Sequence, residues 1–431
     1  MGCSPALSSP VKFTFFILAI ICNIAAMLFR NVIGQQAVKQ HLVEMVAQNR
    51  LSHALLFLGR EGGGALPLAL AFANYVSLVP DTSAQDAGGL FGEPVEVKLP
   101  ATPEEADAWM EKQPSYLKAS EMVHPDIHYS YPTINTKPGK PSISTDFAQQ
   151  WREFMGQMPY GNVYDWLQFI GAENKQGNIT AQECNEIIRK LNLKSFESGY
   201  KILVMWMPEF LGTEANKLLK LIEEPPPDTL FILVAENDSK MLTTVLSRCQ
   251  LIRVPAIDNE AIEKHLLEKA NLSPEKARMI AGAADGSYRE ALDLLNHAGE
   301  DFLSLLRDWL NACLKNDVPK QVKVIEEISR LGREKQKQLL RHFIQLIEQA
   351  LRLQVGGSAL QQQLQAMLTA GELDFASRLN KVMDVGKKNA VTEELDQASY
   401  HVERNANAKI LFHALTIKIY HIVKHNVVMS A

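Results

Sequence analysis

The chain has 431 residues, of which 46% are hydrophobic, and this is enough for two to four domains with cores of their own. Its formal net charge of −5 argues against a dedicated nucleic-acid binder that neutralises many phosphates, so any contact with DNA should be local or shared with partners. The five cysteines lie far apart in the sequence, which excludes a CxxC redox pair and the usual spacing of zinc ligands. This cysteine usage fits a reduced intracellular setting.

The first part of the chain carries an apolar run of 17 residues, 13–29, between Lys12 and Arg30. Its length is at the low end of what spans a membrane and exceeds most signal-peptide cores. Three interpretations are open for it: a membrane anchor or signal peptide, a start site assigned too far upstream, or a buried helix.

A glycine-rich loop follows the first predicted strand. Residues 32–49 predict a helix with one apolar face, and residues 52–58 predict a buried strand. The sequence GREGGGAL at residues 59–66 then leads into a helix that continues through Tyr75. Strand, glycine-rich loop and helix in this order are the context of a phosphate-binding loop.

The residues that would hold phosphate in such a loop are missing. The motif requires Gly-x-x-x-x-Gly-Lys-Ser/Thr, in which the lysine neutralises phosphate oxygens and the hydroxyl binds magnesium. Ala65 stands at the lysine position and Leu66 at the hydroxyl position. The loop keeps four glycines: Gly59, Gly62, Gly63 and Gly64. We expect a relic that retains the turn without hydrolysis; a glycine-rich turn unrelated to nucleotides is the alternative.

The middle of the chain predicts a crossover unit of a parallel sheet. Residues 201–207 and 230–235 are short, continuous apolar runs, typical of strands buried on both faces. A helix at residues 213–224 separates them and ends at three prolines. A further apolar stretch, residues 251–254, follows the segment 243–249. Strand, helix and strand in this arrangement build open α/β sheets that bind ligands at the strand ends.

The rest of the chain is predicted to be helical. Helices are expected at residues 146–154, 180–193, 259–272 and 274–284, and residues 285–292 open another. Beyond residue 300 every long stretch is amphipathic, and these stretches are residues 302–314, 318–331, 335–353, 360–369, 374–389 and 392–424.

Three sequence features together resemble the AAA+ ATPase subunits of bacterial clamp loaders. They are MLFRNVIGQQAVKQHL at residues 27–42, EANKLLKLIEEPP at residues 214–226, and LSRC at residues 246–249 after the intervening strand. The resemblance runs from Met27 to the C-terminus and favours a start at Met27, with residues 1–26 as a doubtful extension, either a mis-assigned start or an apolar anchor.

The resemblance implies an α/β AAA+ core with a parallel sheet and flanking helices at residues 27–254. A small helical lid at 255–299 and an all-α collar that oligomerises the subunits at 300–431 would follow. The implied partners are the gamma/tau and delta clamp-loader subunits, the sliding β-clamp and primed DNA, in the cytoplasm and without a membrane.

The resemblance also assigns the second half of the ATP site. In ATPases of this class, the strand that matches residues 201–207 ends in an Asp-Glu pair. The Asp holds magnesium through a water molecule, and the Glu polarises the water that attacks the phosphate. Trp206 and Met207 stand at those positions, and Glu209 beyond them is expected to be a solvated or helix N-terminal charge. Arg289 matches the sensor arginine of active members; a nucleotide contact and a salt bridge from lid to core both stay open.

Arg248 is the residue to which the resemblance assigns a catalytic role. In related loaders the LSRC arginine faces the neighbouring subunit and reaches its ATP in trans, as an arginine finger. The alternative is a structural arginine that pairs in cis with Glu223 or Glu224. We therefore expect a non-hydrolysing subunit with no cofactor of its own. An active gamma/tau-type ATPase and a membrane-anchored AAA+ adaptor are the alternatives.

No metal is expected. Many members of this family bind zinc through four clustered cysteines in the region matching residues 79–120, and residues 81–116 contain none. His124, Asp126 and His128 would be the nearest replacement ligands, but their sequence HPDIH resembles an ordinary turn and strand entry of the family.

Overall fold

The computed structural model describes residues 27–80, 99–135, 141–172, 175, 177–270, 272–296, 302–356, 368–403 and 406–425. The chain forms two compact units, residues 1–298 and 299–431. Residues 1–26, to which the interpretations of the N-terminal extension apply, lie outside the described residues, as does most of the helix expected at residues 360–369.

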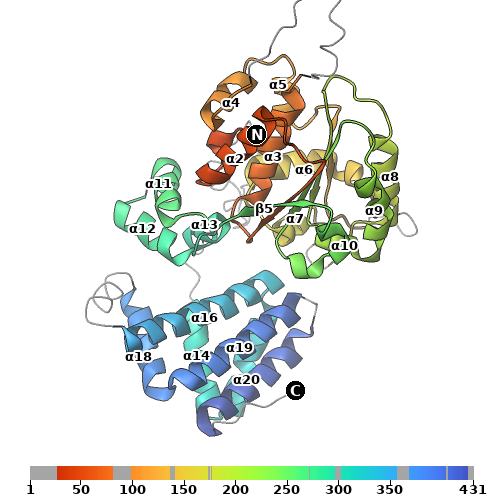
Figure 1. The fold of residues 1–431 in the computed structure, drawn as a ribbon. Helices are drawn as coiled ribbons and strands as arrows, with labels where there is room; N and C mark the ends of the chain where they lie inside the picture. The colour runs from red at the N-terminus through yellow and green to blue at the C-terminus, as the bar shows by residue number, and fades with distance from the viewer. Residues whose placement is uncertain are drawn as a thin grey trace, which may run out of the picture. The chain divides into compact units, whose positions relative to one another are not determined.

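A five-stranded parallel sheet forms the centre of the first unit (Figure 1). Its strands are β1 (Ala54–Gly59), β2 (Ile127–Ser130), β3 (Lys201–Trp206), β4 (Thr229–Ala235) and β5 (Gln250–Val254), in the order β2-β3-β4-β1-β5. Every neighbouring pair is parallel, so the carboxyl ends of all five strands meet at one edge. Strands β3 and β4 are buried along their whole length, which explains their continuous apolar sequences.

Helices cover both faces of the sheet. They are α2 (Gln36–Ala47), α3 (Ala65–Leu78), α4 (Pro103–Met110), α5 (Tyr116–Ser120), α6 (Ala148–Gln157), α7 (Val163–Phe169), α8 (Ala181–Leu191), α9 (Ala215–Glu223) and α10 (Thr243–Leu246). Among the described residues, 3-10 segments accompany them at η1 (Phe29–Asn31), η3 (Ser144–Phe147), η4 (Pro208–Glu214), which is interrupted at Gly212, and η5 (Asp238–Lys240). The alternation along β1 separates two cores, with Leu55 and Phe57 facing the core that contains α3, and Ala54 and Leu56 facing the core that contains α8 and α9.

The helix predicted from residue 32 begins four residues later, at Gln36. Gly34 and Gln35 both have left-handed backbone angles, with φ of 62° and 61°, so the chain turns before it becomes helical. The Gln35 side-chain amide donates hydrogen bonds to the carbonyls of Gly63 (3.1 Å) and Pro255 (2.6 Å). This turn is therefore tied to the glycine-rich loop.

Three further helices complete the first unit and are called the lid helices: α11 (Asn259–Ala270), α12 (Pro274–Ala283) and α13 (Tyr288–Asn296). They share a small core that includes Ile262, Leu266 and Ile280. Ile33 and Tyr160, which lie far from the lid helices in the sequence, belong to the same core. The lid helices are thus packed against the turn before α2 and the segment before α7.

The second unit is helical throughout its described residues. Its helices are α14 (Phe302–Leu314), α15 (Val318–Arg330), α16 (Arg333–Val355), α18 (Ala370–Val382), α19 (Val385–Glu403) and α20 (Ala408–His425). A single core contains Trp309, Phe343 and Phe412. The Trp309 indole N–H donates to the Thr416 hydroxyl at 2.8 Å, which satisfies a buried donor.

Two helix predictions in this unit are wrong. The helix expected at residues 374–389 is broken at Met383, which is extended, and the helix expected at 392–424 is broken before α20. At each break a short polar side chain caps the helix that follows: Asp384 accepts from the Lys387 N–H (2.9 Å) and Asn407 from the Ile410 N–H (3.3 Å). Asp and Asn compete with the helical backbone in this way, which an apolar periodicity does not reveal.

The α/β core and the all-helical C-terminal region are confirmed.

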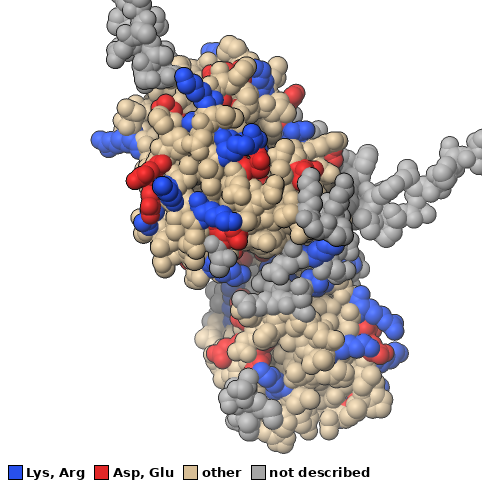
Figure 2. Space-filling view, turned by 90° about the vertical axis from the view of Figure 1, so that its right-hand side faces the viewer, with Lys and Arg blue, Asp and Glu red and all other residues tan. Residues whose placement is uncertain are grey.

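The described surface is mixed in charge on the face drawn in Figure 2, where Lys and Arg side chains lie among acidic and uncharged ones. Within the described residues, every helix is too short or too polar to span a lipid bilayer.

Candidate functional site

The glycine-rich loop lies at the carboxyl edge of the sheet, as predicted. Strand β1 ends at Gly59 and helix α3 begins at Ala65, so the loop joins the central strand to a helix whose residues are all buried. Gly62 and Gly64 have φ angles of 69° and 90°, which side chains rarely adopt. The loop thus makes a tight turn from strand to helix, and Ala65 and Leu66 are the first two residues of the helix.

The space in front of this loop is almost filled by side chains. A cavity of about 20 Å³ remains there, bordered by Leu66, Tyr160 and Trp206 among others. A single ordered water occupies about 10–15 Å³ on this scale, so the cavity has room for about one water and none for a phosphate group. All three side chains are at most 5% exposed, so they belong to the packed interior beside the loop.

Trp206 and Met207, at the positions where the resemblance expects an acidic pair, belong to the hydrophobic core. The Trp206 indole packs against Trp151 with ring centroids 5.3 Å apart, and Met207 is 6% exposed. Glu209 lies in the first turn of η4, but its carboxylate is not solvated. Its Oε1 accepts the backbone N–H groups of Glu236 (2.7 Å) and Asn237 (2.9 Å), and burial raises the pKa of this carboxyl. These two hydrogen bonds link η4 to the segment that follows β4.

Arg289 forms the salt bridge from lid to core that the sequence left open. Its side chain is 6% exposed and makes a bidentate pair with Asp165 of α7, at 2.6 and 2.9 Å. It also pairs with Glu61 of the glycine-rich loop (3.2 Å) and with Asp293 of α13 (3.0 Å). The backbone N–H of Tyr288 donates to the Gly62 carbonyl at 3.0 Å, which adds a backbone link between the same two segments. Carboxylates of this chain thus surround the guanidinium of Arg289.

The close approach of loop and lid predicts a large effect of Gly62→Ala. A Cβ at Gly62 would lie 2.2 Å from the Ser287 Oγ and 2.9 Å from the Arg289 Cβ, at a φ angle unfavourable for alanine. We expect a loss of about 2–4 kcal/mol in the free energy of unfolding, measured by urea denaturation. Gly171→Ala is the matched control, because Gly171 has a similar φ of 72° but open space around it, and about 1 kcal/mol is expected. Equal losses in the two variants would contradict the close packing of loop and lid.

Arg248 lies directly after α10, at the surface. Its Nη1 donates to the Thr244 carbonyl (2.8 Å) and the Ser247 hydroxyl (3.2 Å), and its Nη2 lies 2.5 Å from the Glu223 Oε1. The side chains of Arg248 and Glu223 are 35% and 42% exposed. The pairing in cis with Glu223 therefore exists in this chain, at a site that another molecule can reach.

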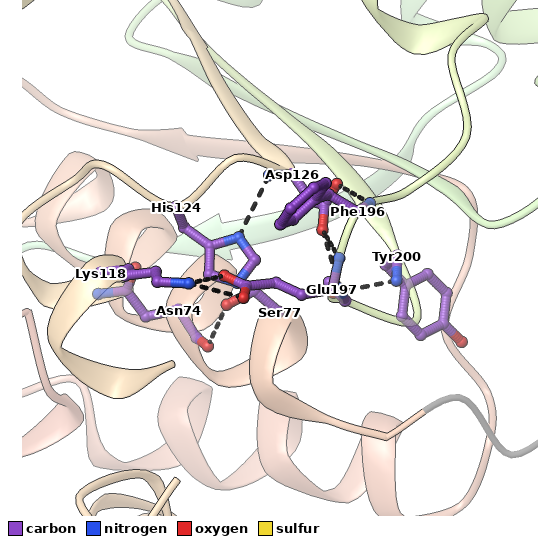
Figure 3. A network of polar contacts seen from close by, with 9 residues as sticks. Asn74, Ser77, Lys118, His124, Asp126, Phe196, Glu197 and Tyr200 are labelled. Carbon is purple, nitrogen blue, oxygen red and sulfur yellow. Dashed lines mark hydrogen bonds and ion pairs between the residues drawn. The ribbon is translucent and has the colours of Figure 1, made fainter. Parts of the chain in front are cut away.

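His124, Asp126 and His128 form an ordinary turn and strand entry rather than a cluster of ligands. The Asp126 carboxylate accepts three consecutive backbone N–H groups, of residues 196–198, at 2.6 to 2.8 Å (Figure 3). The Asp126 N–H donates to His124 Nδ1 at 3.2 Å, and burial lowers the pKa of both imidazoles, that of His128 to about 4. Among the described residues, no group of three or more His, Cys, Asp or Glu side chains could hold a metal ion.

Comparison with known proteins agrees with this architecture. Residues 102–258 match the model of the family described as DNA polymerase III, delta subunit. The chain is 26% identical over 260 residues to the DNA polymerase III subunit delta' of Bacillus subtilis, and 24% identical over 276 residues to subunit tau/gamma of Haemophilus influenzae. These matches support a member of the clamp-loader group of AAA+ proteins.

The shared parts are limited in extent. The two matches cover 60% and 63% of this chain, and 59% and 30% of the length of the relatives. Among solved structures, a gamma subunit-related protein of Thermotoga maritima is 15% identical with a TM-score of 0.30, and covers 90% of this chain and all of that one. The RuvB Holliday junction branch migration motor of the same organism is 15% identical with a TM-score of 0.35, covering 80% of this chain and 86% of that one. TM-scores this low support no further conclusion.

Three residues that contact the site were not predicted from the sequence. Glu61 and Asp165 hold Arg289, and Tyr160 fills the space beside Gly64, with its hydroxyl accepting the Ile33 N–H at 2.8 Å. Glu61 had a weak signal in the sequence, because a carboxylate inside a phosphate-binding loop repels phosphate. Asp165 and Tyr160 had none, since their role depends on the fold that brings α7 to the loop.

Proposed function

We propose that this chain is the delta-prime subunit of the DNA polymerase III clamp loader, a subunit that does not hydrolyse ATP. It has an AAA+ core at residues 27–254, a lid at 255–299 and an oligomerising collar at 300–431. Its partners are the gamma/tau and delta subunits, and through the complex it acts on the sliding β-clamp and primed DNA in the cytoplasm. Its chemical contribution is Arg248, presented in trans to the ATP of the neighbouring subunit.

The observation that carries this proposal is the filled phosphate site. Hydrolysis needs a cation and a magnesium ligand at the loop, and Ala65 and Leu66 supply neither. The cavity of about 20 Å³ in front of them has no room for phosphate, and Arg289 is already paired with carboxylates. A subunit that keeps the AAA+ fold but lacks the groups that hydrolyse ATP is suited to act on the ATP bound by a neighbouring subunit.

A gamma/tau-type ATPase is the second candidate, because relatives of that name match this chain at 24–38% identity. Such an enzyme needs a lysine at position 65 and acidic groups where Trp206 and Met207 lie. The residues of the site therefore favour delta-prime. A membrane-anchored adaptor would depend on residues 1–26.

Nucleotide binding by the isolated chain tests the proposal. Loss of two charge-assisted phosphate contacts, each worth about 1.5–3 kcal/mol, weakens binding by about 10²- to 10⁴-fold. We expect no saturable ATP binding at millimolar nucleotide in equilibrium dialysis, and no turnover. The double variant Ala65→Lys/Leu66→Ser should not restore turnover, because Trp206 and Tyr160 still fill the site. ATP hydrolysis that a Gly64 substitution abolishes would contradict the proposal and favour the gamma/tau candidate.

A further inference from the structure

The ion pair between Arg248 and Glu223 joins two segments whose backbones are both fixed. Glu223 is the last residue of α9, whose Leu218 and Ile222 are each 2% exposed. His53 Nε2 lies 3.0 Å from the Ile222 carbonyl, so the end of this helix is attached to the start of β1. The carboxylate is thus presented from a rigid support.

The segment that carries Arg248 is fixed as well. Val245 is 3% exposed, and its carbonyl accepts the Arg248 N–H at 3.1 Å. The guanidinium has bonds on both of its terminal nitrogens, Nη1 to Thr244 and Ser247 and Nη2 to Glu223. Because Nη1 is already engaged by Thr244 and Ser247, a phosphate would be bound through Nε and Nη2, and Glu223 competes for Nη2.

Glu223 is the partner that a phosphate would replace. Thr244 and Ser247 belong to the same short segment as Arg248, whereas Glu223 reaches it from a different helix. The pair is half-exposed, so it contributes little to stability and opens readily. A phosphate carries more charge than one carboxylate and offers more acceptor oxygens, so it competes well for the same nitrogens.

We infer that Glu223 restrains Arg248 in the free subunit and must release it when the γ-phosphate of a neighbour's ATP arrives. This inference rests on the proposed role of Arg248. It makes Glu223 a positioning residue that acts through Arg248 and lowers the fraction of time in which the guanidinium is available in trans. Removing its charge should therefore increase hydrolysis.

The test compares Glu223→Gln with Glu224→Gln in the reconstituted clamp loader. Both variants remove one negative charge from adjacent positions, but only the first lies in the ion pair with Arg248. We expect Glu223→Gln to raise kcat/KM for ATP roughly two- to fivefold, and Glu224→Gln to leave it unchanged. In the isolated chain, nuclear magnetic resonance of the arginine side chains should show faster rotation of the Arg248 guanidinium in Glu223→Gln.

The outcomes distinguish this inference from the proposed function. If Arg248→Ala slows hydrolysis while Glu223→Gln leaves the rate unchanged or lowers it, Arg248 acts in trans and the restraint by Glu223 is wrong. If Arg248→Ala has the wild-type rate, the proposed function itself is wrong. If Glu223→Gln still accelerates a complex that carries Arg248→Ala, Glu223 acts by another route and the inference is overturned.

Discussion

Replacing Arg248 by alanine should slow ATP hydrolysis at the neighbouring subunit's site by about 10³- to 10⁵-fold, the range that arginines acting in trans contribute elsewhere. In the proposed role, the planar guanidinium would stabilise the charge that develops on the phosphate oxygens as the bond breaks, and water would replace it poorly. Assembly should be unaffected, because the side chain is 35% exposed and its contacts lie within its own chain. Single-turnover hydrolysis by the reconstituted complex measures this effect.

Two variants sharpen the result. Arg253→Ala is the matched control, since Arg253 is an exposed arginine on the following strand, and it should keep the wild-type rate. Arg248→Lys keeps the charge but loses the planar fork, so its rate should fall between the other two. If Arg248→Ala hydrolyses ATP at every site as the wild type does, the chain is a scaffold without a catalytic contribution.

Replacing Arg289 by alanine should lower the free energy of unfolding of the first unit by about 3–5 kcal/mol. The substitution would leave Asp165 with a side chain only 9% exposed and no cation, close to Glu61 and Asp293. Uncompensated buried charge is among the costliest single changes in a folded protein. Urea denaturation of the isolated chain, followed by tryptophan fluorescence, measures the loss.

Arg278→Ala is the control for this prediction. Arg278 belongs to the lid helices as well, but it is 71% exposed and pairs with Glu263 at 3.3 Å. Its loss should change the free energy of unfolding by less than about 1 kcal/mol. An Arg289→Ala variant as stable as Arg278→Ala would show that the contact between lid and core does not depend on the buried arginine.

The sheet could be predicted from the sequence because its strands are buried on both faces. Strands β3 and β4 read as continuous apolar runs, and the prolines after α9 mark the end of the crossover helix. The sequence also predicts that the loop has no lysine or hydroxyl for phosphate, because Ala65 and Leu66 occupy positions fixed by the spacing of the glycines. Local pattern is sufficient for features that a few consecutive residues determine.

What fills the site could not be predicted, because it depends on residues far apart in the chain. Glu61, Asp165 and Arg289 meet only when α7 and the lid helices pack against the loop. The environment of Glu209 could not be predicted for the same reason, because its carboxylate accepts backbone N–H groups from residues beyond β4. In the second unit the helix breaks at Asp384 and Asn407 were missed, since capping by a single side chain interrupts an otherwise continuous apolar face.

The amplitude of the fast phase of ATP hydrolysis tests the central claim most directly. Reconstituted clamp loaders that carry wild-type, Arg248→Ala or Arg253→Ala chains would be mixed rapidly with ATP, β-clamp and primed DNA, after equal assembly has been verified by gel filtration. The proposed role in trans predicts that Arg248→Ala loses one ATP equivalent per complex from the fast phase, while Arg253→Ala keeps the full amplitude. A fast phase of unchanged amplitude and rate in the Arg248→Ala complex would contradict it.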